Sequence, residues 1–128
     1  MAIELTQAVD SVHTGDLIEY SAVRQVRKKM MQSETVVTEL VCYEPGQFTK
    51  PHIHPNQDEI FFCVEGTGAI TFTDDDKEDI PIRQGSVVFV PAGVRHGVAT
   101  DEGNRLVLMF TKGPGLPNLN REKKAAAA

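Results

Sequence analysis

Between Val23 and Phe110 the chain is a series of short runs of β-branched and aromatic residues, separated by Gly, Pro, Asp and Asn. No stretch of this region keeps its apolar residues at the 3.6-residue period of a helix. The connecting segments are too short for the crossover helices that parallel strands need. The sequence therefore predicts an all-β protein, either a sandwich or a small barrel. The predicted strands are Val23–Met31, Thr35–Tyr43, Pro51–His54, Glu59–Val64, Ala69–Thr73, Asp79–Arg83, Val87–Val90, Val94–Ala99 and Arg105–Thr111.

The length of 128 residues fits one domain, because a chain of this size buries most of its apolar surface in a single core. We expect this domain at 21–112, since the run Gly113-Pro114-Gly115-Leu116-Pro117 suits neither a strand nor a helix. Residues 1–20 are predicted to form an N-terminal arm, and residues 113–124 a tail. Residues 125–128 are four alanines without a sequence logic of their own, and they are interpreted as a remnant of cloning.

The composition bears on the partners and the location of the protein. Its 13 basic and 18 acidic residues give a net charge of −5, which argues against nucleic-acid binding. The one basic run, Arg27-Lys28-Lys29, is interpreted as a solvated strand or loop. No membrane partner and a cytoplasmic location are expected, because the chain lacks both a membrane-length apolar segment and the pattern of a secretion signal. Cys42 and Cys63 lie in apolar runs and are expected to be reduced core residues.

Three of the four histidines fall in two short segments. His52 and His54 are one residue apart, so an extended strand would direct both imidazoles to the same face. An intervening turn would bring Glu59 beside them, and His96 would come from a later strand. The four side chains predict a metal site. The alternative is that the first two histidines lie on the surface of an edge strand and that His96 is a hydrogen-bonded loop residue.

The two histidine segments resemble the two motifs of the cupin superfamily. The first runs Gly46, five residues, His52-Ile53-His54, four residues, Glu59, six residues, Gly66. The second runs Gly85, five residues, Pro91-Ala92-Gly93, two residues, His96. The Asn that usually ends the second motif is Thr100 in this chain, which puts the contribution of that Asn in question. Together the motifs span about half of the chain.

The resemblance implies a cupin double-stranded β-helix, a jelly-roll-like barrel of antiparallel strands that holds a metal ion. Asp58 is a rival for the carboxylate ligand, because the family tolerates a spacing of three residues. Glu59 is preferred, since only from Glu59 does the six-residue interval to Gly66 hold. The motif glycines are expected at sharp turns with positive φ. The implied metal ligands are His52, His54, Glu59 and His96.

Three neutral imidazoles and one carboxylate suit one divalent transition metal, Fe, Mn, Ni, Zn or Cu, rather than Mg²⁺ or Ca²⁺. Four protein ligands on an octahedral ion leave two positions for substrate or dioxygen. The site is therefore expected to be catalytic, with Glu59 as its catalytic carboxylate. Its local charge of about +1 favours a substrate that chelates through anionic oxygens, such as an enolate, a carboxylate or a deprotonated catechol-like pair.

Strand alternation predicts the lining of a substrate pocket around the metal. Lys50 would either hold a substrate carboxylate or extend into solvent, and Cys63 would be either a pocket thiol or, as is favoured, a core residue. A largely apolar wall suits a small organic substrate better than a highly hydroxylated sugar. The residues predicted to share a strand face with a metal ligand are Lys50, Phe61, Cys63, Val94 and Val98.

By the same resemblance, cupins with this ligand set include dioxygenases, oxalate-degrading enzymes, sugar-phosphate isomerases, cyclases and lyases, and members that only bind or regulate. Fold and ligands do not choose among these activities. The favoured hypothesis is an oxygenase or related oxidoreductase, dioxygenase-like, acting on a small chelating acid or diketone-like compound. The alternatives are a non-redox isomerase, cyclase or lyase, and a small-molecule binding protein without turnover.

A second apolar face predicts self-association. Ile60, Phe62 and Val64 alternate with the residues that are expected to point inward, so the outer face of their strand also needs a cover. Small cupins often pair in this way and frequently exchange an N-terminal arm. The resemblance therefore implies a homodimer in which residues 1–20 take part.

Overall fold

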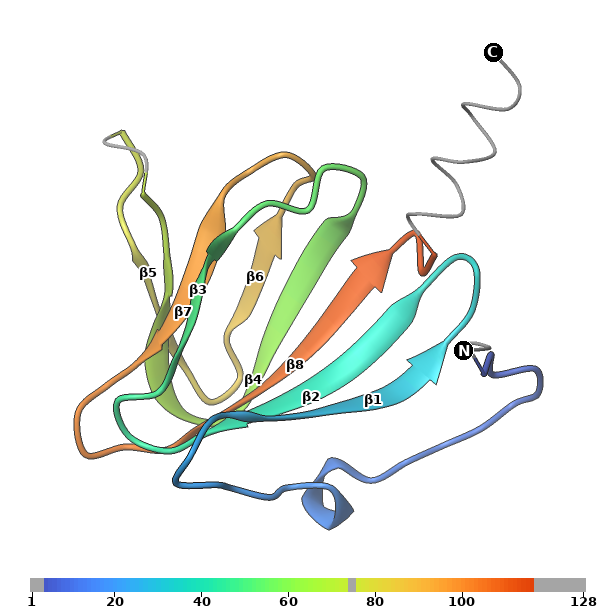
Figure 1. The fold of residues 1–128 in the computed structure, drawn as a ribbon, viewed down its shortest axis with the longest axis horizontal. Helices are drawn as coiled ribbons and strands as arrows, with labels where there is room; N and C mark the ends of the chain where they lie inside the picture. Colours follow the sequence, from blue (N-terminus) through green and yellow to red (C-terminus); the bar gives the residue numbers. More distant parts are fainter. Residues whose placement is uncertain (1–3, 74–75, 117–128) are drawn as a thin grey trace.

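The computed structural model of the protein describes residues 4–73 and 76–116. In these residues the strands form one sheet in the order β1-β2-β8-β4-β7-β3, and β5 and β6 also pair with β4. All of these pairs are antiparallel, and the sheet curls into a half-barrel (Figure 1). The predicted all-β architecture is confirmed. The elements are η1 (Thr14–Asp16), β1 (Val26–Gln32), β2 (Val37–Tyr43), β3 (Phe48–His52), β4 (Asp58–Thr71), β5 (Ile80–Arg83), β6 (Val87–Val90), β7 (His96–Thr100) and β8 (Leu106–Gly113).

The strand β4 is a continuous segment of 14 residues where the sequence predicted two strands and a turn. Its first half pairs with β8 and β6, and its second half pairs with β5 and β7. The bend between the halves is a register shift between Cys63 and Glu65, followed by Gly66 with a φ of 90°. A Cβ on Gly66 would overlap the carbonyl oxygen of Arg105. Glycine therefore permits both the positive φ and the close approach to β8.

The strand β3 begins and ends earlier than the predicted strand Pro51–His54. Its register with β7 shifts between Thr49 and His52, so that β3 carries one extra residue. Because of this bulge Thr49, rather than Lys50, lies on the inner face together with His52. The expectation that Lys50 shares this face is thus corrected, and its side chain is exposed.

Apolar side chains pack on both faces of the curled sheet. The inner core contains large buried residues from most of the strands, and the outer face carries a smaller cluster around Leu40, Cys42 and Val107. Both cysteines are free and buried, as expected. The largest inner core residues are Tyr43, Phe61, Ile70, Ile82, Leu106, Leu108 and Phe110.

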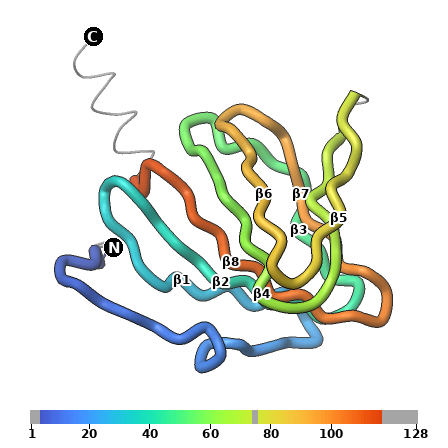
Figure 2. The backbone as a smooth tube through the Cα atoms, turned by 180° about the vertical axis from the view of Figure 1, so that it is seen from behind, coloured from blue at the N-terminus to red at the C-terminus, as the bar shows by residue number. Residues whose placement is uncertain are grey.

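The N-terminal segment runs along the outside of the sheet beside β1 (Figure 2). The Thr6 N–H donates to the Gln32 carbonyl at 2.8 Å, and the Thr6 hydroxyl accepts from the Gln32 N–H. Further on, Leu17, Ile18 and Tyr20 pack against the outer cluster. In its described part, the predicted arm therefore covers the sheet of its own chain.

The chain stays attached to the sheet beyond the predicted domain end at residue 112. The strand β8 continues through Gly113, and the Gly115 N–H donates to the Glu34 carbonyl at 2.9 Å. The rest of the predicted tail, 117–124, and the four alanines of 125–128 lie outside the described residues.

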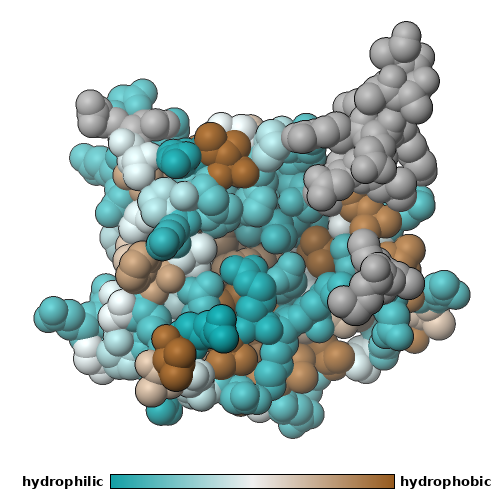
Figure 3. All heavy atoms as spheres, viewed as in Figure 1, coloured by the Kyte–Doolittle hydropathy of each residue, from teal (hydrophilic) through white to brown (hydrophobic). Residues whose placement is uncertain are grey.

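The surface seen in the orientation of Figure 1 is mostly hydrophilic, with hydrophobic groups scattered among the polar ones (Figure 3). Among the described residues, no helix has the length and apolar character that a membrane span requires.

Candidate metal centre

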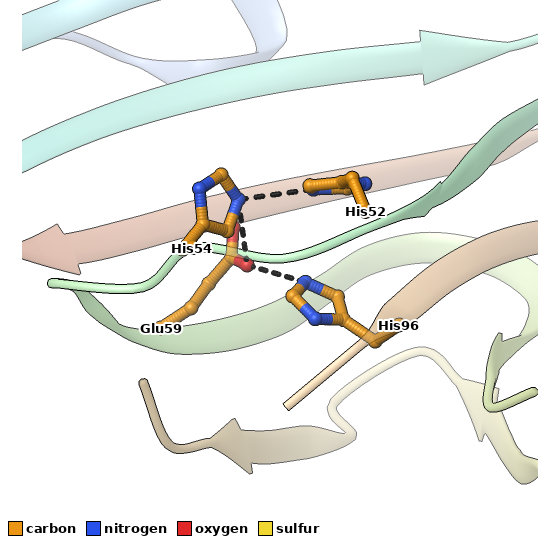
Figure 4. A group of neighbouring side chains, drawn as sticks. All are labelled: His52, His54, Glu59 and His96. Atoms are coloured by element: carbon orange, nitrogen blue, oxygen red, sulfur yellow. Dashed lines mark hydrogen bonds and ion pairs between the residues drawn. The ribbon is translucent and has the colours of Figure 1, made fainter. Parts of the chain in front are cut away.

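Four side chains, three imidazoles and one carboxylate, meet inside the half-barrel (Figure 4). His52 ends β3, His54 lies in the loop after it, Glu59 is the second residue of β4 and His96 opens β7. In the register of β3 and β7, His52 lies directly opposite His96. The loop of His54 is tied to the other motif by a 3.0 Å hydrogen bond from the Gly93 N–H to the His54 carbonyl. Strand pairing and the hydrogen-bonded loop of His54 thus bring together all four residues that the sequence predicts as ligands.

The potential ligand atoms of the four residues lie within 4.8 Å of one another. His52 Nε2 is 2.9 Å from His54 Nε2. Glu59 Oε1 is 2.8 Å from His96 Nε2 and 3.6 Å from His54 Nε2. Glu59 and His96 are buried, with 2% and 1% of their surface exposed, whereas His52 and His54 are half-buried. The cluster is therefore closed on the side of Glu59 and His96 and accessible from the side of His52 and His54.

Backbone carbonyls fix the ring orientation of two of the histidines. His52 Nδ1 is 2.8 Å from the Lys50 carbonyl oxygen, and His96 Nδ1 is 2.9 Å from the Val94 carbonyl oxygen. A carbonyl can only accept, so each Nδ1 carries a proton and donates it. In the neutral ring, Nε2 then presents its lone pair to the cluster, which is the arrangement of an imidazole that ligates a metal.

Burial and charge act differently on the imidazoles of His54 and His96. Burial lowers the pKa of His54 to about 4, although the charge of Glu59 opposes this shift, and Lys112 adds to the lowering. Burial also lowers the pKa of His96, but the hydrogen bond and charge of Glu59 outweigh it, and the pKa of His96 is raised. At neutral pH His54 is therefore an uncharged ligand, whereas His96 and Glu59 favour a cation between them.

The donor set fits a divalent transition metal. The lone pair of neutral His96 Nε2 faces a carboxylate oxygen 2.8 Å away, a contact that either a proton or a metal ion between the two atoms makes favourable. Three imidazole nitrogens with one carboxylate oxygen suit Fe, Mn, Ni, Zn or Cu better than Mg²⁺ or Ca²⁺, which prefer oxygen ligands. The cluster could therefore hold a metal ion.

A cavity of about 310 Å³ adjoins the ligands. This volume is at the lower end for ligand pockets and suits a small molecule. Phe61 and Phe110 form an edge-to-face pair in its wall, with ring centroids 4.8 Å apart. Two of the predicted lining residues, Phe61 and Val98, line the cavity. Besides His52, His54 and Glu59, its lining comprises Arg27, Thr49, Phe61, Val98, Phe110 and Lys112.

Three predicted lining residues lie elsewhere. Lys50 is exposed on the outer side of the β3 bulge. Val94 packs against the inner core. The Cys63 thiol is buried 3.6 Å from the carbonyl oxygens of Glu65 and Gly66, and burial raises its pKa to about 11. The structure thus places Cys63 in the core, the alternative that the sequence favoured.

Sequence reasoning missed four lining residues, of which the two cations are the most consequential. Lys112 lies one residue beyond the predicted strand Arg105–Thr111. Extending that strand by one residue would have placed Lys112 on the same face as Phe110. Arg27 belongs to the basic run that is predicted to be solvated, and its side chain is 38% exposed, but it also lines the cavity because of how β1 pairs with β2.

Two positions that the motif comparison left open have hydrogen-bonding roles. Asp58 Oδ1 accepts from the Ala92 N–H at 2.9 Å and so supports a turn, while the neighbouring Glu59 faces the imidazoles. The Thr100 hydroxyl accepts from the Gly46 N–H at 2.8 Å and donates to the Gln47 carbonyl at 2.9 Å. Thr100 therefore ties the end of β7 to the turn before β3.

Comparison with known proteins gives matches over the central part of the chain. A family model described as the cupin domain matches residues 39–111. Acireductone dioxygenase 1 of Vitis vinifera is 41% identical over 66 residues, which are 48% of this chain and 34% of that protein. Acireductone dioxygenase of Sulfurihydrogenibium sp. is 31% identical over 84 residues, 63% of this chain and 46% of that protein. A vicilin-like seed storage protein of Arabidopsis thaliana is 45% identical over 56 residues, 43% of this chain and 11% of that protein.

In each of these three matches the aligned part spans less than half of the relative. Among solved structures, a Klebsiella pneumoniae protein described as having a double-stranded β-helix domain is similar, with a TM-score of 0.76. The similarity covers 86% of this chain and 94% of that one at 14% identity. It confirms the double-stranded β-helix as the fold of the chain.

Proposed function

The chain belongs to the cupin domain family, and on this premise we propose that it is a metal-dependent oxygenase for a small chelating organic acid or diketone-like compound. The observation that carries the proposal is the cluster of three imidazoles and one buried carboxylate beside a small cavity. The partial similarity to two acireductone dioxygenases supports the oxygenase class. That similarity covers less than half of either relative, so the activity and its substrate belong to the proposal.

The residues of this chain would prepare the site in three ways. The carbonyls of Lys50 and Val94 hold the rings of His52 and His96 with Nε2 directed at the centre. Glu59 supplies the anionic ligand. A bound divalent metal would supply a positively charged centre with free positions for a chelating substrate and dioxygen.

The wall of the cavity has a separate role. Phe61 and Phe110 form an apolar surface next to the ligands, and Phe61 also contacts the His96 ring with centroids 5.6 Å apart. Such a surface keeps water away from one side of a bound substrate and strengthens the electrostatic interactions within the site.

The proposal is tested by oxygen uptake. The protein would be loaded with Fe²⁺, Mn²⁺ or Ni²⁺ under nitrogen and screened with 2-oxo acids, diketones and catechols in an oxygen electrode, with product analysis. Oxygen uptake coupled one-to-one to substrate loss supports the oxygenase. Turnover that continues at the same rate under nitrogen would contradict it in favour of a non-redox enzyme, and saturable binding without product would contradict it in favour of a binding protein. The His52→Ala/His54→Ala double variant is the control for reactions of free metal.

A further inference from the structure

Lys112 lies beside the carboxylate ligand and has no part in the chemistry proposed so far. In the pairing of β4 and β8 it is directly opposite Glu59. Residues in this relationship have Cβ atoms about 5 Å apart on the same face of the sheet. The Lys112 side chain is only 11% exposed and lines the cavity, so its ammonium group does not extend freely into solvent.

Arg27 supplies a second cation to the same cavity. It pairs with Val41, a residue of the inner core, and therefore lies on the inner face of β1. Its guanidinium carbon is 5.2 Å from the centroid of the Phe110 ring, a cation–π contact that holds the group against the apolar wall.

Glu39 connects the two cations. Its Oε2 is 3.0 Å from Arg27 Nη1, and its Oε1 is 3.6 Å from Lys112 Nζ. One carboxylate between two cations leaves one positive charge in excess at this end of the cavity. The carboxylate also limits the cost of desolvating the two cations and restricts their positions.

We propose that Arg27 and Lys112 form an anion subsite, positioned by Glu39, which binds a carboxylate of the substrate while the other end of the substrate chelates the metal. This inference rests on the proposed function, because it places the chelating end at the metal. The substrate class is thereby narrowed to small diacids whose chelating end is a 2-oxo acid or a similar group. The aromatic pair of Phe61 and Phe110 favours an apolar or planar segment between the two ends.

Affinities of matched acids test the subsite without a measurement of turnover. The protein would be loaded with Zn²⁺, which is redox-inert and diamagnetic, and titrated by calorimetry at constant pH and ionic strength. The probes are 2-oxoglutarate and 2-oxoadipate, each compared with the monoacid of equal chain length, 2-oxovalerate and 2-oxohexanoate. We expect at least one diacid to bind about tenfold more tightly than its monoacid, because a carboxylate between two cations makes charge-assisted hydrogen bonds.

Single-charge variants assign the preference to the subsite. Arg27→Met and Lys112→Met should each reduce the affinity for the diacid more than the affinity for the monoacid, and the double variant should abolish the preference for the diacid. Lys112→Arg should retain the preference. The matched control is Lys28→Met, which removes one positive charge from the outer face of β1, where Lys28 pairs with Glu19 at 3.0 Å. A preference that is missing in the unmodified protein, or that survives in the double variant, overturns the inference and leaves the proposed function standing.

A second measurement tests the anion subsite even if the protein binds no metal. If the protein bound neither Zn²⁺ nor the monoacids, the proposed function would fail, and metal-free protein would then be titrated with glutarate and followed by NMR. Saturable chemical-shift changes of the Arg27 Nε–H and Lys112 ammonium signals with glutarate support the anion subsite, provided that acetate at the same concentration of negative charge does not cause them. Unchanged signals overturn it.

Discussion

Glu59 Oε1 and His96 Nε2 lie 2.8 Å apart in the interior of the half-barrel, where both side chains are almost completely buried. The two residues belong to different sequence motifs, and the β4–β7–β3 arrangement brings them together. Because His96 Nδ1 donates to the Val94 carbonyl, the Nε2 lone pair of the neutral ring faces the Glu59 carboxylate, and a proton or a metal ion between the two atoms makes this contact favourable. This contact is the centre of the proposed metal site, and it makes the effects of substitutions around it predictable.

The first prediction concerns metal content. His96→Ala, or His52→Ala together with His54→Ala, should remove most of the bound divalent ion, because each change deletes imidazole ligands. Metal would be measured by mass spectrometry after dialysis, and the fold by far-ultraviolet circular dichroism. His13→Ala is the control, since His13 only caps the turn η1 through its contact with the Gly15 N–H. Full metal occupancy in the His52→Ala/His54→Ala variant would refute the proposed site.

The charge of Glu59 distinguishes two mechanisms. Glu59→Gln keeps the size of the ligand but leaves a more positive ion, which is harder to oxidise and polarises a carbonyl more strongly. An oxygenase should therefore lose far more turnover than metal, by about 100-fold or more. Asp58→Asn is the matched control. It removes the negative charge of the neighbouring carboxylate, which accepts a hydrogen bond in a turn and does not face the imidazoles. Activity of Glu59→Gln equal to that of the unmodified protein would argue for Lewis-acid chemistry.

Two glycines with similar backbone angles should differ in their tolerance of alanine. Gly66 and Gly46 have φ values of 90° and 84°, but only at Gly66 would a Cβ overlap a backbone carbonyl. Gly46→Ala should cost about 1–2 kcal/mol in the free energy of unfolding, the cost of the left-handed conformation alone. Gly66→Ala should cost about 3 kcal/mol or more, since β8 must also move. Equal urea midpoints for Gly46→Ala and Gly66→Ala would show that the contact with Arg105 adds nothing to the cost of the substitution.

Self-association is proposed through the outer face of β4 and β6. Ile60 pairs with Phe89 and Phe62 pairs with Val87, and these four side chains are 36–65% exposed. An exposed apolar patch of this kind is typical of an interface. Sedimentation at micromolar concentration should give a dimer that Phe62→Lys/Phe89→Lys dissociates.

The control for the dimer is Phe48→Lys, which changes an equally exposed phenylalanine on β3. It should leave the dimer intact. A monomer of 14.1 kDa for the unmodified protein would contradict the proposal.

The thiols should be unreactive in the folded protein. Burial raises the pKa of Cys63 to about 11 and also raises that of Cys42, so both groups are protonated at pH 8. Because the thiolate is the reactive form, native protein should react with a thiol reagent far more slowly than protein unfolded in urea, which should expose two thiols. Raising the pH toward 11 should accelerate the reaction of the folded protein, because a larger fraction of the Cys63 thiol is then ionised. Fast labelling of folded protein at pH 8 would show that a thiol reaches the cavity or the surface.

The sequence alone determined the fold class and the group of candidate metal ligands. The runs that became β2 and β6 contain enough β-branched and apolar residues to be recognised locally, and turn residues mark their ends. His52, His54 and Glu59 are close in the sequence, so a single strand and turn suffices to bring them together. His96 is far from them in the sequence, and the family resemblance supported its place in the site through the glycine and proline positions of the second motif.

Only the tertiary structure decided which side chains surround the candidate site. The bulge in β3 exchanged Lys50 for Thr49 on the inner face, and the pairing of β8 with β4 placed Lys112 beside Glu59. The pairing of β1 with β2 turned Arg27 toward Phe110. Side chains alternate with a period of two, so a register shift of one residue moves a side chain to the opposite face. Register depends on contacts between strands that are far apart in the chain, and no local sequence pattern records those contacts.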